Sequence, residues 1–197
     1  VNLESTPLSG NTAAVTFNIG NADTFGITGV QNVTLSGTEA IMSAATVTET
    51  ATGTVIANVT DAGTGADYSL VTADSINHAV AVGVGTYTYA SGANVTMAAN
   101  PAAINLDIDD DAGGTTTVGL LNLTLGADST GVMTIENTAD EIDTLNVLAS
   151  VAQTALDFRA DNTASTGDTV NLNGSVAIAV AATNTALSLD GSNMTGG

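Results

Sequence analysis

The stretch Leu121-Asn122-Leu123-Thr124-Leu125 places three leucines two residues apart, with short polar side chains between them. Side chains of a β-strand alternate between its two faces, so this pattern predicts a strand with one apolar and one polar face. The same unit recurs at irregular intervals as Asn32–Leu35, Asn94–Met97, Val170–Asn173 and Leu187–Asp190. The recurrence predicts an all-β fold of many short strands, either a β-solenoid or a β-sandwich.

Strand starts recur about every 8–14 residues, with turns rich in Gly, Asn and Asp between them. The segment Ala139–Ala160 also fits helical spacing, but its apolar-x-apolar units favour strand. We expect less than about a tenth of the residues in helices, against about a third in an ordinary domain. The further predicted strands are Ala14–Ile19, Thr46–Ile56, Ala79–Val84, Thr86–Ala90, Ile104–Ile108, Val132–Ile135, Thr144–Val147, Thr154–Phe158 and Val176–Val180.

The core has to be built from small side chains. The chain has no Trp, three Phe and three Tyr, and its apolar residues are mostly Ala, Val, Leu and Ile. Because large aromatic residues dominate ordinary cores, this composition favours repetitive layers of small residues. The most polar stretch begins at Asp107. A domain boundary there would divide the chain into two β-rich segments, 1–106 and 107–197. The alternative is that the whole chain forms one continuous domain.

The charge is strongly one-sided, with 20 acidic residues, a single Arg, no Lys and a net charge of −19. Such a surface repels nucleic-acid phosphates and anionic membranes, so neither is an expected partner. Self-repulsion of this size calls for screening by salt or bound cations, and hard cations such as Ca²⁺ prefer carboxylate oxygens. The alternative to cation binding is that the acidic residues only keep the protein soluble or adapt it to a salty habitat.

Signals of export and anchoring are sparse. The chain has no Cys, which excludes disulfides and thiolate metal sites, and it has no apolar run long enough to span a membrane as a helix. Its first residues, Val1–Ser5, lack the basic and apolar regions of a signal peptide, and it stops in a turn at Gly196-Gly197. We expect a piece of a longer protein.

Two segments resemble bacterial surface proteins. The closing Asp190-Gly191-Ser192-Asn193-Met194-Thr195-Gly196-Gly197 follows a strand and is similar to the Asp-x-Ser-x-x-Thr-Gly-Gly turn of surface-layer (S-layer) and RTX-type exported proteins. Ile27–Gly37 resembles their recurrent Gly-apolar-acid-x-Leu-x-Leu strand, with Gln31 where an acid is usual. The resemblance implies type I export, a secreted protein on the extracellular cell surface, calcium dependence and self-assembly.

The run Asp107-Ile108-Asp109-Asp110-Asp111 is the strongest candidate ion site. If Ile108 points inward, Asp107 and Asp109 share the outer face, and Asp110 and Asp111 enter the following turn. Carboxylates this close raise one another's pKa unless a cation lies among them, and Ca²⁺ takes about six to eight oxygen ligands. A solvated acidic loop is the alternative interpretation.

Two further acids are candidate metal ligands through the same resemblance. Gly63-Thr64-Gly65-Ala66-Asp67 and Gly126-Ala127-Asp128 are similar to half of the RTX nonapeptide, which binds calcium between successive coils. The resemblance therefore adds Asp67 and Asp128 to the candidate set. Neither copy repeats in tandem, so a complete calcium β-roll is not expected in this chain.

Residues for catalysis are few. His78 is the only histidine and Arg159 the only strong cation. Asp74 and Ser75 precede His78, but a triad needs a convergent base and an oxyanion hole, and His78 in a strand rich in small apolar residues is read as structural. Paired carboxylates could hydrolyse glycosides, but sugar clefts are typically lined with aromatic residues. We expect no enzyme activity.

Two further sequence patterns concern residues that are expected at the surface, a series of alternating threonines and a set of glycosylation sequons. Thr46, Thr48, Thr50, Thr52 and Thr54 alternate along one predicted strand face, as in ice-binding solenoids, although a solvent-facing strand explains them as well. Asn-x-Ser/Thr sequons occur six times, and chance explains most of them because the chain is rich in Asn and Thr. They start at Asn32, Asn58, Asn94, Asn122, Asn173 and Asn193.

These patterns lead to one main expectation and two alternatives. The main expectation is a structural protein of a calcium-dependent bacterial surface layer, which assembles with itself into a lattice and has cell-surface polysaccharide as a further candidate partner. The first alternative is a module of an RTX-type adhesin. The second is an archaeal surface filament or coat protein, which glycosylated sequons would favour.

Overall fold

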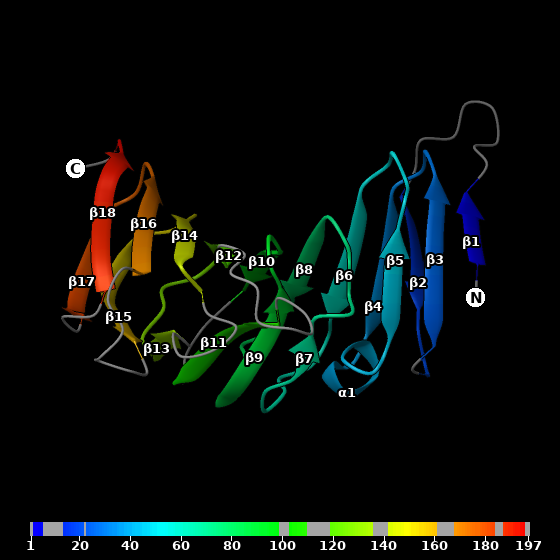
Figure 1. Cartoon of the computed structure of the whole chain (residues 1–197), viewed down its shortest axis with the longest axis horizontal. Coiled ribbons are helices and arrows are strands. Elements are labelled where there is room, and N and C mark those ends of the chain that lie inside the picture. The colour runs from blue at the N-terminus through cyan, green and yellow to red at the C-terminus, as the bar shows by residue number, and fades with distance from the viewer. Residues whose placement is uncertain are drawn as a thin grey trace.

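The computed structural model describes residues 2–5, 14–21, 23–98, 103–109, 119–135, 142–160, 168–183 and 187–195. The chain winds into a β-solenoid of about seven turns, with 60% of the described residues in strands and almost no helix among them (Figure 1). This confirms the all-β prediction and selects the solenoid over the sandwich. In the described part of the chain, none of the helices has the length and apolarity that a membrane crossing requires.

The chain alternates between sheets, because even-numbered strands share one nine-stranded sheet while odd-numbered strands form a three-stranded and a six-stranded sheet. The nine-stranded sheet contains β2 (Val15–Asn18), β4 (Val33–Gly37), β6 (Val55–Val59), β8 (Ser75–His78), β10 (Asn94–Met97), β12 (Leu120–Leu125), β14 (Thr144–Ala149), β16 (Asp168–Gly174) and β18 (Leu187–Met194). The three-stranded sheet contains β1 (Asn2–Ser5), β3 (Thr24–Gly29) and β5 (Thr46–Glu49). The six-stranded sheet contains β7 (Asp67–Tyr68), β9 (Gly85–Ala90), β11 (Ile104–Asp109), β13 (Val132–Ile135), β15 (Gln153–Ala160) and β17 (Ile178–Thr183).

Within each sheet, every strand pairs in parallel with the strand two places later, as β12 does with β14. A coil that advances by one strand per turn produces this order, since parallel neighbours need a crossover connection. The register brings like side chains together: Leu123 of β12 pairs with Val95 on one side and Val147 on the other. Identical positions of successive coils therefore form rows along the solenoid.

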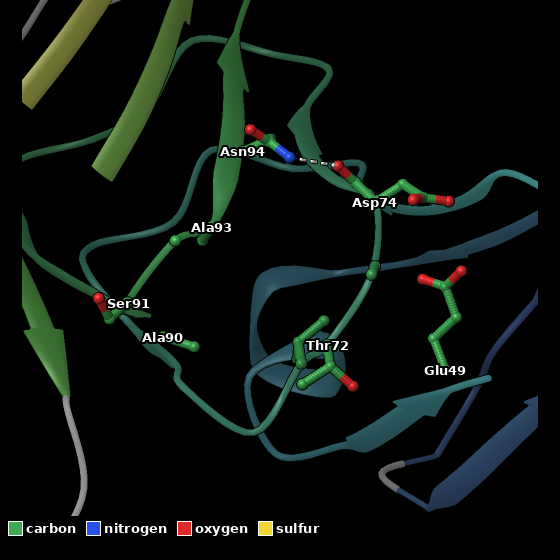
Figure 2. Close-up of a pocket in the computed structure, with 10 residues that line it drawn as sticks. Glu49, Thr72, Asp74, Ala90, Ser91, Ala93 and Asn94 are labelled. Atoms are coloured by element: carbon green, nitrogen blue, oxygen red, sulfur yellow. Dashed lines mark hydrogen bonds between the residues drawn. The ribbon is translucent and has the colours of Figure 1, made fainter. Parts of the chain in front are cut away.

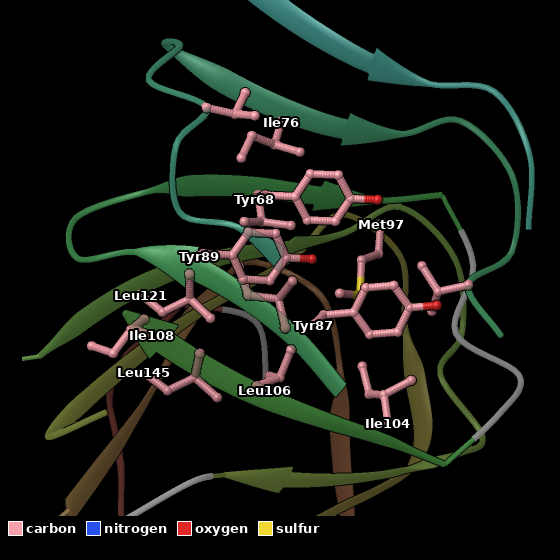
Figure 3. Packing of buried hydrophobic residues seen from close by; sticks show 14 of the residues in the cluster. Tyr68, Ile76, Tyr87, Tyr89, Met97, Ile104, Leu106, Ile108, Leu121 and Leu145 are labelled. Carbon is pink, nitrogen blue, oxygen red and sulfur yellow. The ribbon is translucent and has the colours of Figure 1, made fainter. Parts of the chain in front are cut away.

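The core is a stack of buried aliphatic rows with a few aromatic residues among them. Leu121, Leu123 and Leu125 are all buried, as the alternation in their strand predicts. Five of the six Phe and Tyr residues are also inside, and Figure 3 shows the three tyrosines packed among Ile, Leu and Met side chains. These five are Phe25, Tyr68, Tyr87, Tyr89 and Phe158.

Two predicted strands are wrong in position. Thr46–Ile56 divides into β5 and β6, which lie in different sheets, so its five threonines do not share one strand face. Gly53 marks the corner, because a Cβ there would lie 2.4 Å from the carbonyl oxygen of Gln31. Ala79–Val84 forms the connection from β8 to β9.

Two other segments bear on the sequence-based expectations. Ala139–Ala160 forms β14 and β15 over its described residues, as the strand interpretation predicted. The position considered for a domain boundary, residue 107, falls inside β11, which pairs with β9 and β13. In the described ranges the single α-helix is α1 (Glu39–Met42).

Candidate functional site

The outer face of the nine-stranded sheet has a regular pattern of side chains along its described strands. Two rows of short side chains run along it from coil to coil, and we call these two rows the amide face. The first row is Thr16, Thr34, Ile56, Ser75, Asn94, Asn122, Asn146, Asn171 and Asp190, and the second is Asn18, Ser36, Asn58, Asn77, Thr96, Thr124, Leu148, Asn173 and Asn193. Asp190, in the last strand, is the one charged residue in either row.

Side-chain amides tie the coils together along the first row. The Nδ2 of Asn122 donates to Asn94 Oδ1 at 3.1 Å, that of Asn146 to Asn122 Oδ1 at 2.8 Å, and that of Asn171 to Asn146 Oδ1 at 2.9 Å. Each amide in such a ladder uses one N–H and one acceptor site, which leaves a second N–H for an external group.

A shorter ladder crosses the second row. Asn77 Nδ2 donates to Asn58 Oδ1 at 2.7 Å, and Asn58 Nδ2 donates to the Ser36 hydroxyl at 3.1 Å. The sequon residues Asn58, Asn94 and Asn122 therefore lie within strands and hold hydrogen-bonded positions in the ladders. A hollow of about 440 Å³ on this face is bordered by Asn94, Asn122, Leu123, Thr124, Asn146, Leu148 and Asn173.

We expect the substitution Asn146→Ala to lower the free energy of unfolding by about 1–2 kcal/mol, because it removes two partly buried hydrogen bonds of about 1 kcal/mol each. Asn105→Ala on the six-stranded sheet is the matched control, since its Nδ2 makes a long 3.4 Å contact with the Thr86 hydroxyl in an exposed position. Urea unfolding followed by circular dichroism measures both. Equal stability of the two variants would mean that the ladder adds nothing to the stack.

The predicted acidic site is only partly within the described residues. Asp107 lies on β11 and accepts a hydrogen bond from the Thr88 hydroxyl at 2.9 Å. Asp109 ends β11, and Asp110 and Asp111 lie outside the described residues. The position of a complete four-carboxylate site therefore stays a prediction.

The register brings Asp67 and Asp107 to one row of the six-stranded sheet. Thr88 pairs with Asp67 on one side and with Asp107 on the other. The two acids are thus two strand spacings apart, roughly 10 Å between Cα atoms. Asp67 also accepts the backbone N–H of Ser69 at 2.8 Å.

Asp128 makes a separate contact between coils. Its two carboxylate oxygens accept the backbone N–H of Thr154 at 2.9 Å and the Thr154 hydroxyl at 2.6 Å. These two hydrogen bonds hold the pKa of Asp128 below its usual value. Across the part of the chain that is described, no three Asp, Glu or His residues gather closely enough to hold a metal ion.

A pair of carboxylates that the sequence did not indicate borders a second hollow, of about 360 Å³ (Figure 2). Burial, the charge of Asp74 and a side-chain hydrogen bond with Asp74 raise the pKa of Glu49. Asp74 Oδ2 also accepts the backbone N–H of Val55 at 2.7 Å, and its carbonyl accepts Asn94 Nδ2 at 3.0 Å. Glu49 and Asp74 come from adjacent coils, so only the register reveals the pair.

His78 is a core residue, 1% exposed. Its Nε2 lies 2.9 Å from the Tyr89 hydroxyl, and its ring makes edge contacts with Tyr68 and Tyr87. Burial lowers the pKa of His78 to about 4. Ser75 lies on the amide face while His78 points into the core, so these two residues do not converge as a catalytic triad would require.

Glu39 is one of two buried carboxylates among the described residues, and Asp168 is the other. Its Oε1 accepts the backbone N–H of Thr64 at 2.8 Å, and its own backbone N–H donates to Asp61 Oδ1 at 2.6 Å. The carboxyl group lies against Gly63, where any Cβ would overlap it. Glu39 thus links α1 to the loop of the next coil, and its position is structural.

Comparison of the chain with models of protein families, with curated proteins and with solved structures gives no match.

Proposed function

We propose that this chain is a structural segment of a calcium-dependent bacterial surface layer that assembles with itself on the cell exterior. The observation that supports this proposal most directly is the unbroken stack of nine parallel strands with hydrogen-bonded ladders along its outer face. A stack of this kind is stiff because each coil is tied to both neighbours. Its faces are extended and repetitive, which suits repeated contacts between protomers.

The distribution of charge supports the calcium part of the proposal. Arg159, the only strong cation, binds Asp157 at 3.0 and 2.7 Å, so it offsets a single acid. The remaining acids need another source of positive charge, and Ca²⁺ suits carboxylates that it can share between coils or between protomers. Asp67 and Asp107, in one row, and the acids that follow Asp107 are the candidate ligands.

A module of an RTX-type adhesin is the second candidate. The hollow on the amide face favours it, because neutral amide and hydroxyl groups around the half-exposed Leu148 could bind an uncharged ligand such as a polysaccharide. A soluble monomer that binds polysaccharide in the presence of calcium would support the adhesin over the coat.

Electron microscopy of the purified protein tests the surface-layer proposal. We expect ordered sheets in millimolar CaCl₂, and we expect these sheets to dissolve in EDTA at matched ionic strength. A protein that stays dispersed in both buffers, at concentrations where surface layers crystallise, would contradict self-assembly.

Calcium is expected to raise the melting temperature, because a ligand that binds only the native state stabilises it by mass action. The triple substitution Asp109→Asn, Asp110→Asn and Asp111→Asn should stabilise the protein slightly in EDTA, since it removes repulsion, and destabilise it in calcium, since it removes ligands. The control, Glu136→Gln with Asp140→Asn and Glu141→Gln, removes the same charge elsewhere. Scanning calorimetry of all three proteins in both buffers checks the reversal. If calcium raised the melting temperature of the triple variant as much as that of the parent, the calcium ions would bind at other residues.

A further inference from the structure

Of the outer faces of the nine-stranded and six-stranded sheets, the amide face is the one whose rows bring fewer charges together when two copies meet, and Glu49 and Asp74 lie at its border beside Asn94. From β2 to β16 neither of its rows contains a charged residue, in a chain with a net charge of −19. The outer face of the six-stranded sheet differs, since Asp67, Asp107 and the Asp157–Arg159 pair lie there. Two copies that approached through that face would each present carboxylates to the other.

The geometry of the amide face also matches itself. Its side chains repeat with the strand spacing of about 4.8 Å, and two such sheets can pack face to face at about 10 Å. Stacked Asn side chains with short Ser and Thr neighbours are the composition that packs closely between paired sheets. Leu148, 46% exposed, stands beside the hollow on the same face, so each copy offers both an apolar projection and a recess.

The available area predicts a weak contact. Eight strands at about 4.8 Å spacing, each about five residues long at about 3.3 Å per residue, cover roughly 600 Å² per copy and about 1,300 Å² for the pair. Specific interfaces begin near this size. A single contact of this kind would be reversible. In a lattice the same contact repeats many times, so each one can be weak.

We propose that the amide face is an interface between two copies of this chain, packed sheet against sheet. This inference rests on the self-assembly in the proposed function and assigns one of its contacts to a surface. The interface does not require calcium, because neither of its two rows contains a carboxylate from β2 to β16.

Sedimentation velocity of the chain in EDTA and 150 mM NaCl, from micromolar to millimolar concentration, tests the inference. We expect a reversible monomer–dimer equilibrium. Thr96→Lys and Thr96→Asp, at the centre of the face on β10, should each weaken it at least tenfold, because either charge becomes buried without a partner. Thr134→Lys and Thr134→Asp, on the outer face of β13, are the matched controls and should dimerise as the parent does. Circular dichroism checks that each variant is folded.

Cross-linking gives a second measurement that does not depend on charge. The chain has no cysteine, so Thr96→Cys and Thr134→Cys each introduce a single thiol. Under mild oxidation we expect disulfide dimers to accumulate at least tenfold faster for Thr96→Cys.

Three results would overturn the inference: a parent that stays monomeric, Thr96 variants that dimerise normally, or equal cross-linking at both positions. Retention of the monomer on neutral polysaccharide, lost in the Thr96 variants, would identify a glycan as the occupant instead. Calcium-dependent sheets that form equally well from Thr96→Lys would refute the interface and leave the proposed function standing. A dimer that forms through the amide face, in a protein that forms no calcium-dependent sheets, would support the interface and refute the proposed function.

Discussion

Gly85→Ala is expected to lower the free energy of unfolding by about 3 kcal/mol or more, at the upper end of what overpacking costs. A Cβ at Gly85 would lie 2.0 Å from the carbonyl oxygen of Thr64 and 2.7 Å from the Cα of Gly65. Both atoms belong to the backbone of the preceding coil, so no side-chain rotation can make room. Relief requires the two coils to separate, which breaks hydrogen bonds and opens the core beneath them.

Gly20→Ala is the matched control, because a Cβ there has no atom within 4 Å apart from those of its two chain neighbours. Both substitutions reduce the entropy of the unfolded chain by the same amount, so the difference between them reports the close approach alone. Urea unfolding of the two variants and the parent measures it. A Gly85→Ala protein as stable as Gly20→Ala would mean that the coils are not in contact at this corner.

The same corner shows why part of the fold could not be read from the sequence. The alternation at Leu121, Leu123 and Leu125 correctly predicts which side chains face inward, because period-2 spacing is a local property of a strand. Ala79–Val84 has a similar apolar character, but it passes over another coil, and Val84 is 67% exposed. Contact between coils is a long-range property, and no local pattern indicates it.

The candidate site was predictable to the same limited extent. The Asn and Thr residues of the repeating unit were correctly expected to face away from the core, but their alignment into ladders depends on the register between coils. Glu49 and Asp74 lie one coil apart in the sequence and carry no motif. The buried contact between His78 and Tyr89 likewise joins strands of two different sheets, β8 and β9.

His78 is expected to make the protein about 3 kcal/mol less stable at pH 4 than at pH 7, apart from all other titrations. Burial holds its pKa at about 4 in the folded protein, whereas the unfolded chain has the ordinary value of about 6.5. Between these values the unfolded state takes up a proton that the native state does not, so stability falls as the pH falls. The stabilisation is complete above about pH 6.5 and is lost progressively toward pH 4. A difference of about 2.5 pKa units corresponds to about 3 kcal/mol.

The variant His78→Gln isolates this effect, because glutamine does not titrate and can still form a hydrogen bond with Tyr89. The acidic residues respond in the opposite sense, since their protonation relieves the repulsion of a chain with net charge −19. That response is common to both proteins and cancels when the loss of stability from pH 7 to pH 4 is compared between them. Urea unfolding at both pH values should show a loss about 3 kcal/mol larger in the parent than in His78→Gln. Identical pH dependence would show that the native protein accepts a proton on His78, and hence that the ring is not shut inside the tyrosine cluster.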